Sequence, residues 1–407
     1  MPPSARNPFY ALRHRNFRLF FIGQFISLAG TWMQVVAEGW LVLELTNSAF
    51  LVGLVSALES LPILLLTLYG GVLADRVDKR RAILLLQSGM LLQSLALTLL
   101  TATHHITVAW LMVLATVLGT LSAFEVPIRQ SFMMEMVGRE DLVSAIALNS
   151  SVFNLTRIIG PVVAGGLIAG LGTTVCFGTN TLSFLAVIAA FLRMRPPFAG
   201  AVVTHHEQEP TLRDGVRYVF GSPEPRALLT LAATLGIFGL AAALAMLPVY
   251  ARDILGRGAS GYGGLMAAVG VGAGLGAIVM ASIGHRLDRR RVIPNATLLF
   301  AASLAASTAH ASFGLALVGL AVAGFGSVLA AISTNALLQV DAPDHLRGRV
   351  MGFYSFVVLG LAPFGSLQAG FVSEHLGVRV SFLAGAIICG IGALLFRSGP
   401  SRAPRGA

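Results

Sequence analysis

Polar side chains recur along one face of the first long apolar stretch of the chain. They are separated by three or four residues and comprise Gln24, Ser27, Thr31, Gln34 and Glu38. On a helix these positions fall within an arc of about 80°. In hydrocarbon such a stripe has to face protein or water. It therefore predicts either the lining of a polar cavity or hydrogen bonds between helices, and five polar positions favour the cavity.

A second carboxylate, Glu59, lies near the middle of the apolar stretch 49–74. Three hydroxyl residues share its helical face, namely Ser56, Ser60 and Thr67. An ionised carboxylate at the centre of a bilayer costs about 3 kcal/mol, so it has to be paired, solvated or protonated. We interpret Glu59 as a proton-coupling or substrate-binding residue, with a static hydrogen bond between helices as the alternative. Glu38 lies nearer the outer end of its stretch, where it either shares this role or reaches water.

One basic residue, Arg157, lies inside an apolar stretch, on the same helical face as Asn154 and Pro161. Its expected ion-pair partner is Glu125 or Glu135, near the inner end of the preceding stretch. Glu125 is also spaced for an i, i+4 pair with Arg129, although Pro127 stands between them. We interpret Arg157 as part of a structural ion-pair lock. Direct contact with an anion or a substrate is the alternative.

The composition excludes a cytosolic enzyme. The chain has 407 residues, of which 56% are hydrophobic and 11% are charged, whereas soluble domains carry about 25% charge. Its two cysteines, Cys176 and Cys389, lie in apolar stretches and are predicted to be packing residues. The sequence contains neither a nucleotide-binding loop nor a nucleophile with its base. We therefore expect no enzyme activity, no metal and no cofactor.

Apolar stretches of about 20 residues, the length that crosses a bilayer, predict an all-α membrane protein with twelve transmembrane helices. The predicted spans are Phe17–Leu45, Ala49–Ala74, Ala82–Thr101, Val108–Phe124, Leu142–Leu171, Val175–Leu192, Ala227–Tyr250, Tyr262–Ile283, Val292–Thr308, Leu315–Leu337, Val350–Val372 and Val378–Phe396.

The net charge of +10 is explained by membrane orientation rather than by nucleic-acid binding, because the basic clusters lack interleaved aromatic residues. Both ends of the chain and the connections after even-numbered spans hold 24 of the 28 Lys and Arg residues. The opposite connections hold only Arg252, Arg257 and Arg379. The positive-inside rule therefore predicts that both termini are cytoplasmic.

The longest polar break divides the spans into two sets of six. We expect an N-terminal six-helix bundle over 1–192, a cytoplasmic linker over 193–226 and a C-terminal six-helix bundle over 227–407. Apolar residues share one helical face of the linker, namely Leu212, Val216, Val219 and Phe220. This pattern predicts an amphipathic helix at the membrane interface.

An internal repeat relates the two halves. Gly71 and Asp75 after the second span correspond to Gly284 and Asp288 after the eighth, and a run of basic residues follows each pair. Gly160-Pro161 in the fifth span corresponds to Ala362-Pro363 in the eleventh. Two parallel six-helix halves are typical of many secondary transporters.

These motifs resemble the major facilitator superfamily, whose signature between spans two and three is Gly-x-Leu-Ala-Asp-Arg-x-Gly-Arg-Arg. Here the signature starts at Gly71 and includes Asp75, Arg76 and Arg80, with Asp78 in place of its second glycine. Gly160-Pro161 is similar to the motif in span five of the superfamily's exporters. Residues 11–18, 127–130 and 154–161 are similar to the branch that contains enterobactin and macrolide exporters.

The resemblance implies a secondary exporter that works by alternating access, usually with proton antiport, as a monomer in the bacterial cytoplasmic membrane. Its partners are then a hydrophobic or amphipathic small molecule, protons and the lipid bilayer. Cationic or neutral drugs fit the two carboxylates, whereas a siderophore fits the branch, with Arg157 compensating its charge. The alternative is a membrane sensor or scaffold that keeps the transporter fold without transport.

The resemblance also assigns a conformational gate. Its residues are Gly71, Asp75, Arg76, Arg80, Asp288, Gly160 and Pro161. Alternatively, the basic residues that follow the second span serve only to orient the protein in the membrane. That alternative does not explain Asp75, which can accept hydrogen bonds at the positive end of a neighbouring helix.

Asp75→Asn is expected to preserve membrane insertion, to slow transport and to change the accessibility of the cytoplasmic side. The amide keeps the size of the side chain but removes the negative charge that the helix end attracts. Alkylation of single cysteines placed on each side measures the accessibility. If accessibility and transport are both unchanged, Asp75 has only a packing role.

Overall fold

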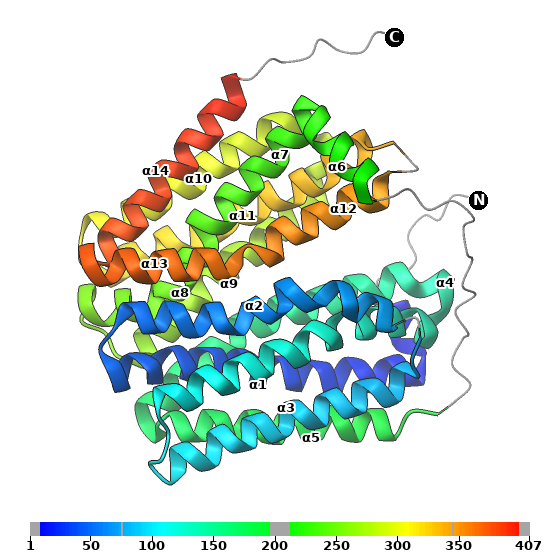
Figure 1. Cartoon of the computed structure of the whole chain (residues 1–407), viewed down its shortest axis with the longest axis vertical. Coiled ribbons are helices and arrows are strands. Elements are labelled where there is room, and N and C mark those ends of the chain that lie inside the picture. Colours follow the sequence, from blue (N-terminus) through cyan, green and yellow to red (C-terminus); the bar gives the residue numbers. More distant parts are fainter. Residues whose placement is uncertain (1–8, 75, 196–211, 344–345, 399–407) are drawn as a thin grey trace. The chain divides into compact units, whose positions relative to one another are not determined.

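The computed structural model describes residues 9–74, 76–195, 212–343 and 346–398, and these are helical with no strand (Figure 1). Within these ranges, twelve helices are long and apolar enough to cross a membrane. The predicted fold class and number of spans are confirmed.

The chain divides into two compact units. The first comprises Met1–His205 with Ala251–Ala267, and the second comprises His206–Tyr250 with Ala268–Ala407. The stretch Ala251–Ala267, predicted to belong to the C-terminal half, therefore packs with the first unit.

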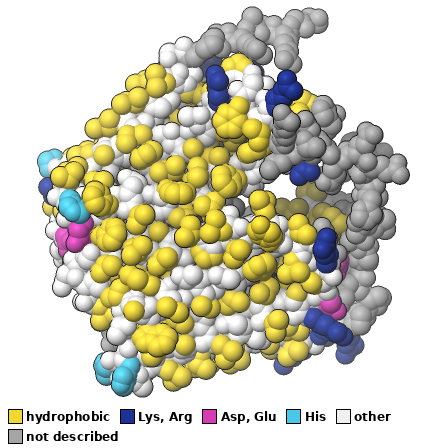
Figure 2. Space-filling view, viewed as in Figure 1, with side chains coloured by type: hydrophobic (Ala, Val, Ile, Leu, Met, Phe, Trp, Pro, Cys, Tyr) yellow, Lys and Arg dark blue, Asp and Glu magenta, His cyan; other side chains and the backbone are white. Residues whose placement is uncertain are grey.

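The first unit is a bundle of long helices that run side by side (Figure 1). Its elements are η1 (Tyr10–Arg13), α1 (Arg15–Thr46), α2 (Ala49–Ala74), α3 (Lys79–Ala102), α4 (Val108–Leu171) and α5 (Thr173–Leu192), with the first part of α9 (Ala259–Ile283). On the face of this unit seen in Figure 2, hydrophobic side chains cover the middle, and the visible Lys and Arg side chains lie at one end.

Helix α4 contains two spans, Val108–Gly138 and Glu140–Leu171, separated at Gly138 by a backbone with φ 72° and ψ 175°. The first of these spans extends well beyond the predicted end at Phe124. The helix continues through Pro127, although a proline removes the hydrogen bond to the carbonyl four residues earlier and its ring crowds that carbonyl. That carbonyl belongs to Ala123, and a Cβ on Gly70 of α2 would lie 2.5 Å from its oxygen.

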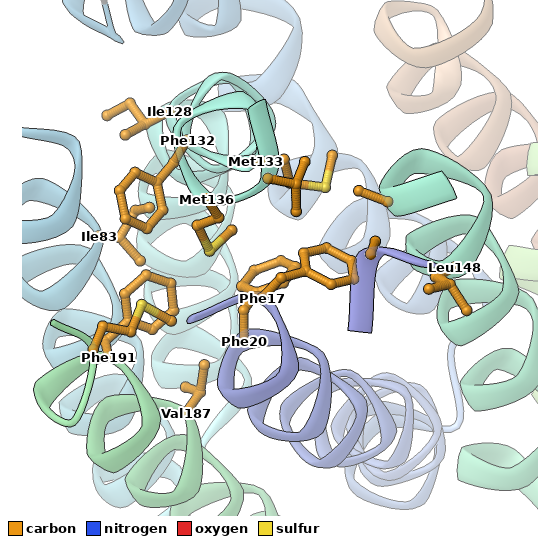
Figure 3. Packing of buried hydrophobic residues seen from close by; sticks show 14 of the residues in the cluster. Phe17, Phe20, Ile83, Ile128, Phe132, Met133, Met136, Leu148, Val187 and Phe191 are labelled. Carbon is orange, nitrogen blue, oxygen red and sulfur yellow. The ribbon is translucent and has the colours of Figure 1, made fainter. Parts of the chain in front are cut away.

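A hydrophobic cluster holds the helices of the first unit together (Figure 3). The rings of Phe132 and Phe191 stack with centroids 5.9 Å apart, and Phe20 meets Phe191 edge to face at 6.1 Å. These side chains come from α1, α4 and α5, and Ile83 of α3 is fully buried beside them. Four segments that are distant in sequence therefore share one core.

The second unit is also helical. Its elements are α6 (Leu212–Gly221), α7 (Pro223–Thr234), η2 (Leu235–Ala241), α8 (Ala242–Val249), most of α9, η4 (Gly284–Arg286), α10 (Arg289–Ala309), α11 (Phe313–Asp341), α12 (Arg347–Ser355), η5 (Phe356–Gly360), α13 (Ala362–Leu376) and α14 (Val378–Ser398). The segment η3 (Tyr250–Ile254) follows α8, and from Ala251 onward it belongs to the first unit. Two of its spans contain a π-helical segment, η2 or η5.

The predicted amphipathic linker helix corresponds to α6, and residues 196–211 of the linker lie outside the described residues. Val219 is buried in a cluster with Leu228 and Val350, and the Tyr218 hydroxyl donates to the carbonyl of Asp341 at 3.0 Å. Phe220 is 62% exposed. One side of the helix therefore packs on the second unit, rather than the whole apolar face lying on the membrane interface.

The register of the internal repeat differs from the predicted one. Asp288 accepts a hydrogen bond from the backbone N–H of Arg290 and caps α10, as Asp78 accepts from Arg81 and caps α3. By its position before a helix, Asp288 corresponds to Asp78, which corrects the alignment of Asp288 with Asp75; its role in a gate stays a prediction. A carboxylate before the first turn of a helix is a capping group, and the run of basic residues that follows hid this distinction.

Gly119→Ala is expected to lower the melting temperature of the purified protein. A Cβ at Gly119 would collide with the backbone carbonyl of Glu59, which cannot rotate away as a side chain would. Overpacking of this kind costs about 1–3 kcal/mol. Gly71→Ala is the matched control, because no atom lies within 4 Å of the added methyl group. Thermal unfolding in detergent measures both, and equal melting temperatures would contradict the close contact of α2 with α4.

Candidate functional site

A buried hydrogen-bond network crosses the first unit. The Asn180 side chain donates to Gln34 Oε1 at 2.7 Å, Gln34 Nε2 donates to Gln93 Oε1 at 3.3 Å, and Gln93 Nε2 donates to the Leu114 carbonyl at 3.1 Å. All three side chains are at most 3% exposed. Gly30 leaves the room for it, because a Cβ there would lie 2.5 Å from Asn180 Oδ1. The network thus joins α1, α3, α4 and α5.

This network corrects the interpretation of Gln34 as a cavity-lining residue. Gln34 is fully buried, Gln24 is 4% exposed, and the Thr31 hydroxyl donates to the Ser27 carbonyl of its own helix at 3.0 Å. The alternative, hydrogen bonding between helices, is the one that the structure shows for Gln34. Gln34 faces α3 and α5, and the sequence alone did not reveal that these helices present the amide partners Gln93 and Asn180 there.

Glu38 follows the network on α1, one turn after Gln34. It is 4% exposed, it interacts with Gln34, and its Oε1 accepts no hydrogen bond from any described residue. Glu59 of α2 lies close enough for electrostatic interaction with Glu38 and with Tyr262 of α9. The ring of Trp40 stacks on Tyr262 with centroids 6.4 Å apart. The first unit therefore brings both predicted carboxylates together, with Glu59 beside Tyr262, on which Trp40 stacks.

Neither carboxylate forms an ion pair with a residue that the structure describes. Two unpaired negative charges in one buried place are costly, because neither is compensated and water is largely excluded. A proton or a bound cation on either group removes that cost. The pair therefore favours the uptake of a proton or of another cation.

The prediction that Arg157 pairs with Glu125 or Glu135 is wrong. Glu125 pairs with Arg129 at 2.9 Å and Glu135 pairs with Lys79 at 2.5 Å. The first span of α4 continues past Phe124, so both carboxylates lie on helical turns that face α3. Glu125 also accepts from Gln87 of α3 at 3.1 Å.

Arg157 instead lies over an aromatic ring. Its guanidinium carbon is 5.8 Å from the centroid of Trp32, whose ring meets Phe153 edge to face at 5.9 Å. Arg157 makes no ion pair within the described ranges. Asn154, on the same face, donates to the Ser150 carbonyl of its own helix at 2.8 Å.

The Gly160-Pro161 motif lies at a close approach of helices. A Cβ on Gly160 would lie 2.6 Å from Trp32 Cβ, and a Cβ on Gly263 would collide with the Pro161 carbonyl. Gly165 similarly faces the Ala259 carbonyl. These contacts, all inside the first unit, bring α4 against α1 and the start of α9.

At the basic end of the unit, Asp75 lies outside the described residues. Gly70, and not Gly71, is the glycine in close contact with α4. Arg80 donates to the carbonyls of Phe191 and Leu192 at 3.0 and 3.1 Å, where it caps the end of α5. Arg76 is exposed. Within the first unit, Arg80 therefore has a structural partner of its own.

Sequence reasoning missed a carboxylate at the same end. Asp141 Oδ2 lies 2.6 Å from Arg13 Nη2 and 2.7 Å from His14 Nε2, and its side chain is 1% exposed. Asn180 and Gln93 were also missed. A polar residue isolated in an apolar span was the available signal, but its partners lie on other helices.

Residues 6–403 match the family described as transmembrane secretion effectors. The chain belongs to this family of major facilitator transporters. It is a multi-pass membrane transporter and not an enzyme, and the resemblance found in its sequence is confirmed.

Curated relatives include exporters of two kinds. The chain is 30% identical to the multidrug efflux pump Tap of Mycolicibacterium fortuitum, over 88% of both chains. It is 26% identical to the enterobactin exporter EntS of Escherichia coli O1:K1, over 94% of this chain and 90% of the relative. It is 23% identical to a staphyloferrin A transporter of Staphylococcus aureus, over 90% of this chain and 91% of the relative.

Solved structures share the fold. A bacterial homologue of the human lysosomal transporter Spinster, inward-facing and occupied, has a TM-score of 0.76 at 14% identity, over 97% of both chains. A D-xylose–proton symporter has a TM-score of 0.72 at 13% identity, over 93% of this chain and 97% of that one. Together the relatives and the family establish a transporter of the efflux type.

Gln34→Leu is expected to lower the melting temperature, because it leaves the buried amides of Asn180 and Gln93 without their partner. Each orphaned group costs about 1–3 kcal/mol. Thr31→Val, on the same helix, removes only a hydrogen bond to the preceding turn and is expected to change stability much less. Thermal unfolding of the purified proteins in detergent compares the two. Equal melting temperatures would show that the network does not stabilise the unit.

Proposed function

We propose that the protein exports an amphipathic small molecule, cationic or neutral, from the bacterial cytoplasm in exchange for protons. The observation that carries the proposal is the pair formed by Glu38 and Glu59, which are close, largely buried and without a cationic partner among the described residues. The multidrug efflux relative supports the same class of substrate.

The exchange follows from the charges of this pair. When both carboxylates are ionised, their burial and their repulsion disfavour the state, so a proton or a substrate cation is taken up. If either a proton or a substrate cation neutralises the site, but not both at once, then binding of the proton releases the substrate and binding of the substrate releases the proton. Protons entering from outside then displace the exported molecule.

The rings of Trp40 and Tyr262 suit this substrate class. Tyr262 lies beside Glu59 and stacks on Trp40, and aromatic rings attract organic cations as well as apolar groups. An uncharged amphipathic molecule uses the same rings, while the proton on the carboxylate pair provides the coupling.

Orientation and movement are part of the proposal. The bias of Lys and Arg supports cytoplasmic termini in the bacterial cytoplasmic membrane. The two halves, with Ala251–Ala267 moving with the first, are proposed to move as bodies that alternate the access of a monomer. Gly160 and Pro161 are proposed to guide this movement, because their neighbours on other helices are in such close contact that a bend in α4 would displace them.

A siderophore is the second candidate substrate, and Arg157 is the observation that favours it. Its guanidinium has no ion-pair partner in the described part of the chain, and it lies over Trp32 with its charge uncompensated. An anionic substrate would supply that charge. The enterobactin exporter among the relatives supports this class.

Glu59→Gln is expected to abolish pH-driven uphill export and to leave downhill substrate exchange. The amide preserves the size of the side chain but cannot take up or release a proton. Glu38→Gln is expected to have the same direction of effect. Proton flux and flux of a cationic dye are followed together in vesicles that contain the purified protein and carry an imposed pH gradient.

Glu374→Gln is the matched control, since it makes the same change at an exposed carboxylate. Unchanged proton coupling in both Glu59→Gln and Glu38→Gln would eliminate the carboxylate pair as the coupling site. Absence of transport of any tested drug or siderophore by the wild-type protein would favour a sensor or scaffold instead.

A further inference from the structure

The second unit contains a cavity of about 230 Å³ that plays no part in the site described above. It lies between α7, α10, α11 and α12, and all of its lining residues belong to this unit. Ile293, Thr297 and Ala330 on its wall are at most 3% exposed. Val358 on the same wall is 36% exposed, so the cavity has a buried floor and an open side.

Two irregular helical segments form part of the wall. Leu235, Gly236 and Leu240 belong to the π-helical segment η2, and Val358 belongs to η5. A π-helical turn widens the helix by one residue and occurs frequently at functional sites. A helix can cross the membrane without such turns, as the continuous α-helix α1 of the first unit does. The π-helical turns are therefore a feature of the cavity wall and not a requirement for crossing the membrane.

The lining is apolar, with hydroxyl groups and without a charged side chain. Three hydroxyls donate to backbone carbonyls of the unit: Thr297 to Ile293, Ser327 to Gly324 and Tyr354 to Ala331. Thr334 differs from them. The residue is 4% exposed, and its hydroxyl makes no hydrogen bond with any described residue. This hydroxyl can therefore bond to a ligand atom without giving up a partner within the unit.

The volume limits the ligand. Pockets for whole drug-sized molecules measure about 300–1,000 Å³, whereas an apolar cavity of about 150 Å³ holds benzene. A space of about 230 Å³ therefore fits a two-ring aromatic or a branched alkyl group, and not a complete drug. The single free hydroxyl fits one oxygen or nitrogen atom on that group.

The cavity lies near the basic end of the unit. Ile293 and Thr297 are in the first turns of α10, directly after Arg289, Arg290 and Arg291. The distribution of Lys and Arg assigns that end to the cytoplasm, the side from which an exporter loads. A molecule arriving from the cytoplasm meets this end of the unit.

We propose that this cavity is a subsite that binds one uncharged aromatic or branched alkyl group of the exported molecule, with a hydrogen bond to Thr334. The proposal rests on the proposed function for the identity of its ligand. It adds a second point of recognition that needs no charge, so substrates that differ in charge share the subsite if they carry such a group.

Protection of a cysteine in the cavity tests the proposal. Ser327→Cys is introduced into a chain that carries Cys176→Ala and Cys389→Ala, and its alkylation by a small thiosulfonate is timed in lipid nanodiscs. The probes are 1-naphthol and naphthalene. Both are expected to slow alkylation in a saturable way, with 1-naphthol effective at a concentration at least about fivefold lower because it bonds to Thr334.

Two further variants make the test specific. Ala232→Leu fills the cavity and is expected to raise the protecting concentration of both probes at least about tenfold, whereas Ala233→Leu, the neighbouring residue outside the lining, leaves it unchanged. Thr334→Val is expected to remove the preference for 1-naphthol and to leave naphthalene unaffected. Export is measured in the same variants, as the loss of transport of a dye that bears a naphthyl group.

Absence of alkylation, or alkylation that neither probe slows, would overturn the proposal. Protection in detergent that disappears in nanodiscs would assign the cavity to a lipid chain and would also overturn it. The readout is binding, so it is independent of proton coupling. Saturable protection in a protein that transports nothing would reject the proposed function and keep the subsite as a binding site, whereas normal transport without protection would do the reverse.

Discussion

Hydrocarbon offers no hydrogen-bond partner, and this constraint determines how the polar residues of the twelve spans are arranged. Gln34, Gln93 and Asn180 meet one another because each would otherwise be buried unsatisfied. Their network joins four helical segments of the first unit, and the glycine at position 30 makes the approach possible. The same close approach of the helices therefore packs the bundle and provides these amide side chains with hydrogen-bond partners.

Against this background, the groups that lack partners are informative. Glu38 Oε1 accepts no hydrogen bond, and the Thr334 hydroxyl makes none, among the residues that the structure describes. One lies beside a second carboxylate in the first unit and the other lines an apolar cavity in the second. Other buried oxygens also accept no hydrogen bond, Gln87 Oε1 and Thr101 Oγ1 among them, so it is the position of Glu38 and Thr334, beside a second carboxylate and on a cavity wall, that makes these two groups informative.

The two units also differ in how their helices are built. Small residues let helices approach closely in both units, as Gly119 does opposite the Glu59 carbonyl and Gly272 does opposite the Ala321 carbonyl. The second unit in addition interrupts two of its spans with π-helical segments, and residues of both segments line its cavity. The widened turns, rather than looser packing, therefore distinguish the wall of this cavity.

The sequence alone determined the number of spans, the all-α class, the family and the presence of carboxylates in apolar helices. These follow from composition and from patterns along one helix, which are local properties. It did not determine which helices face each other. Gln34 became part of a network, Glu125 and Glu135 found α3 instead of Arg157, and Asp288 became a helix cap. Only the tertiary structure decided these partners, because a side chain's partner depends on the helix opposite to it, and that helix is distant in sequence.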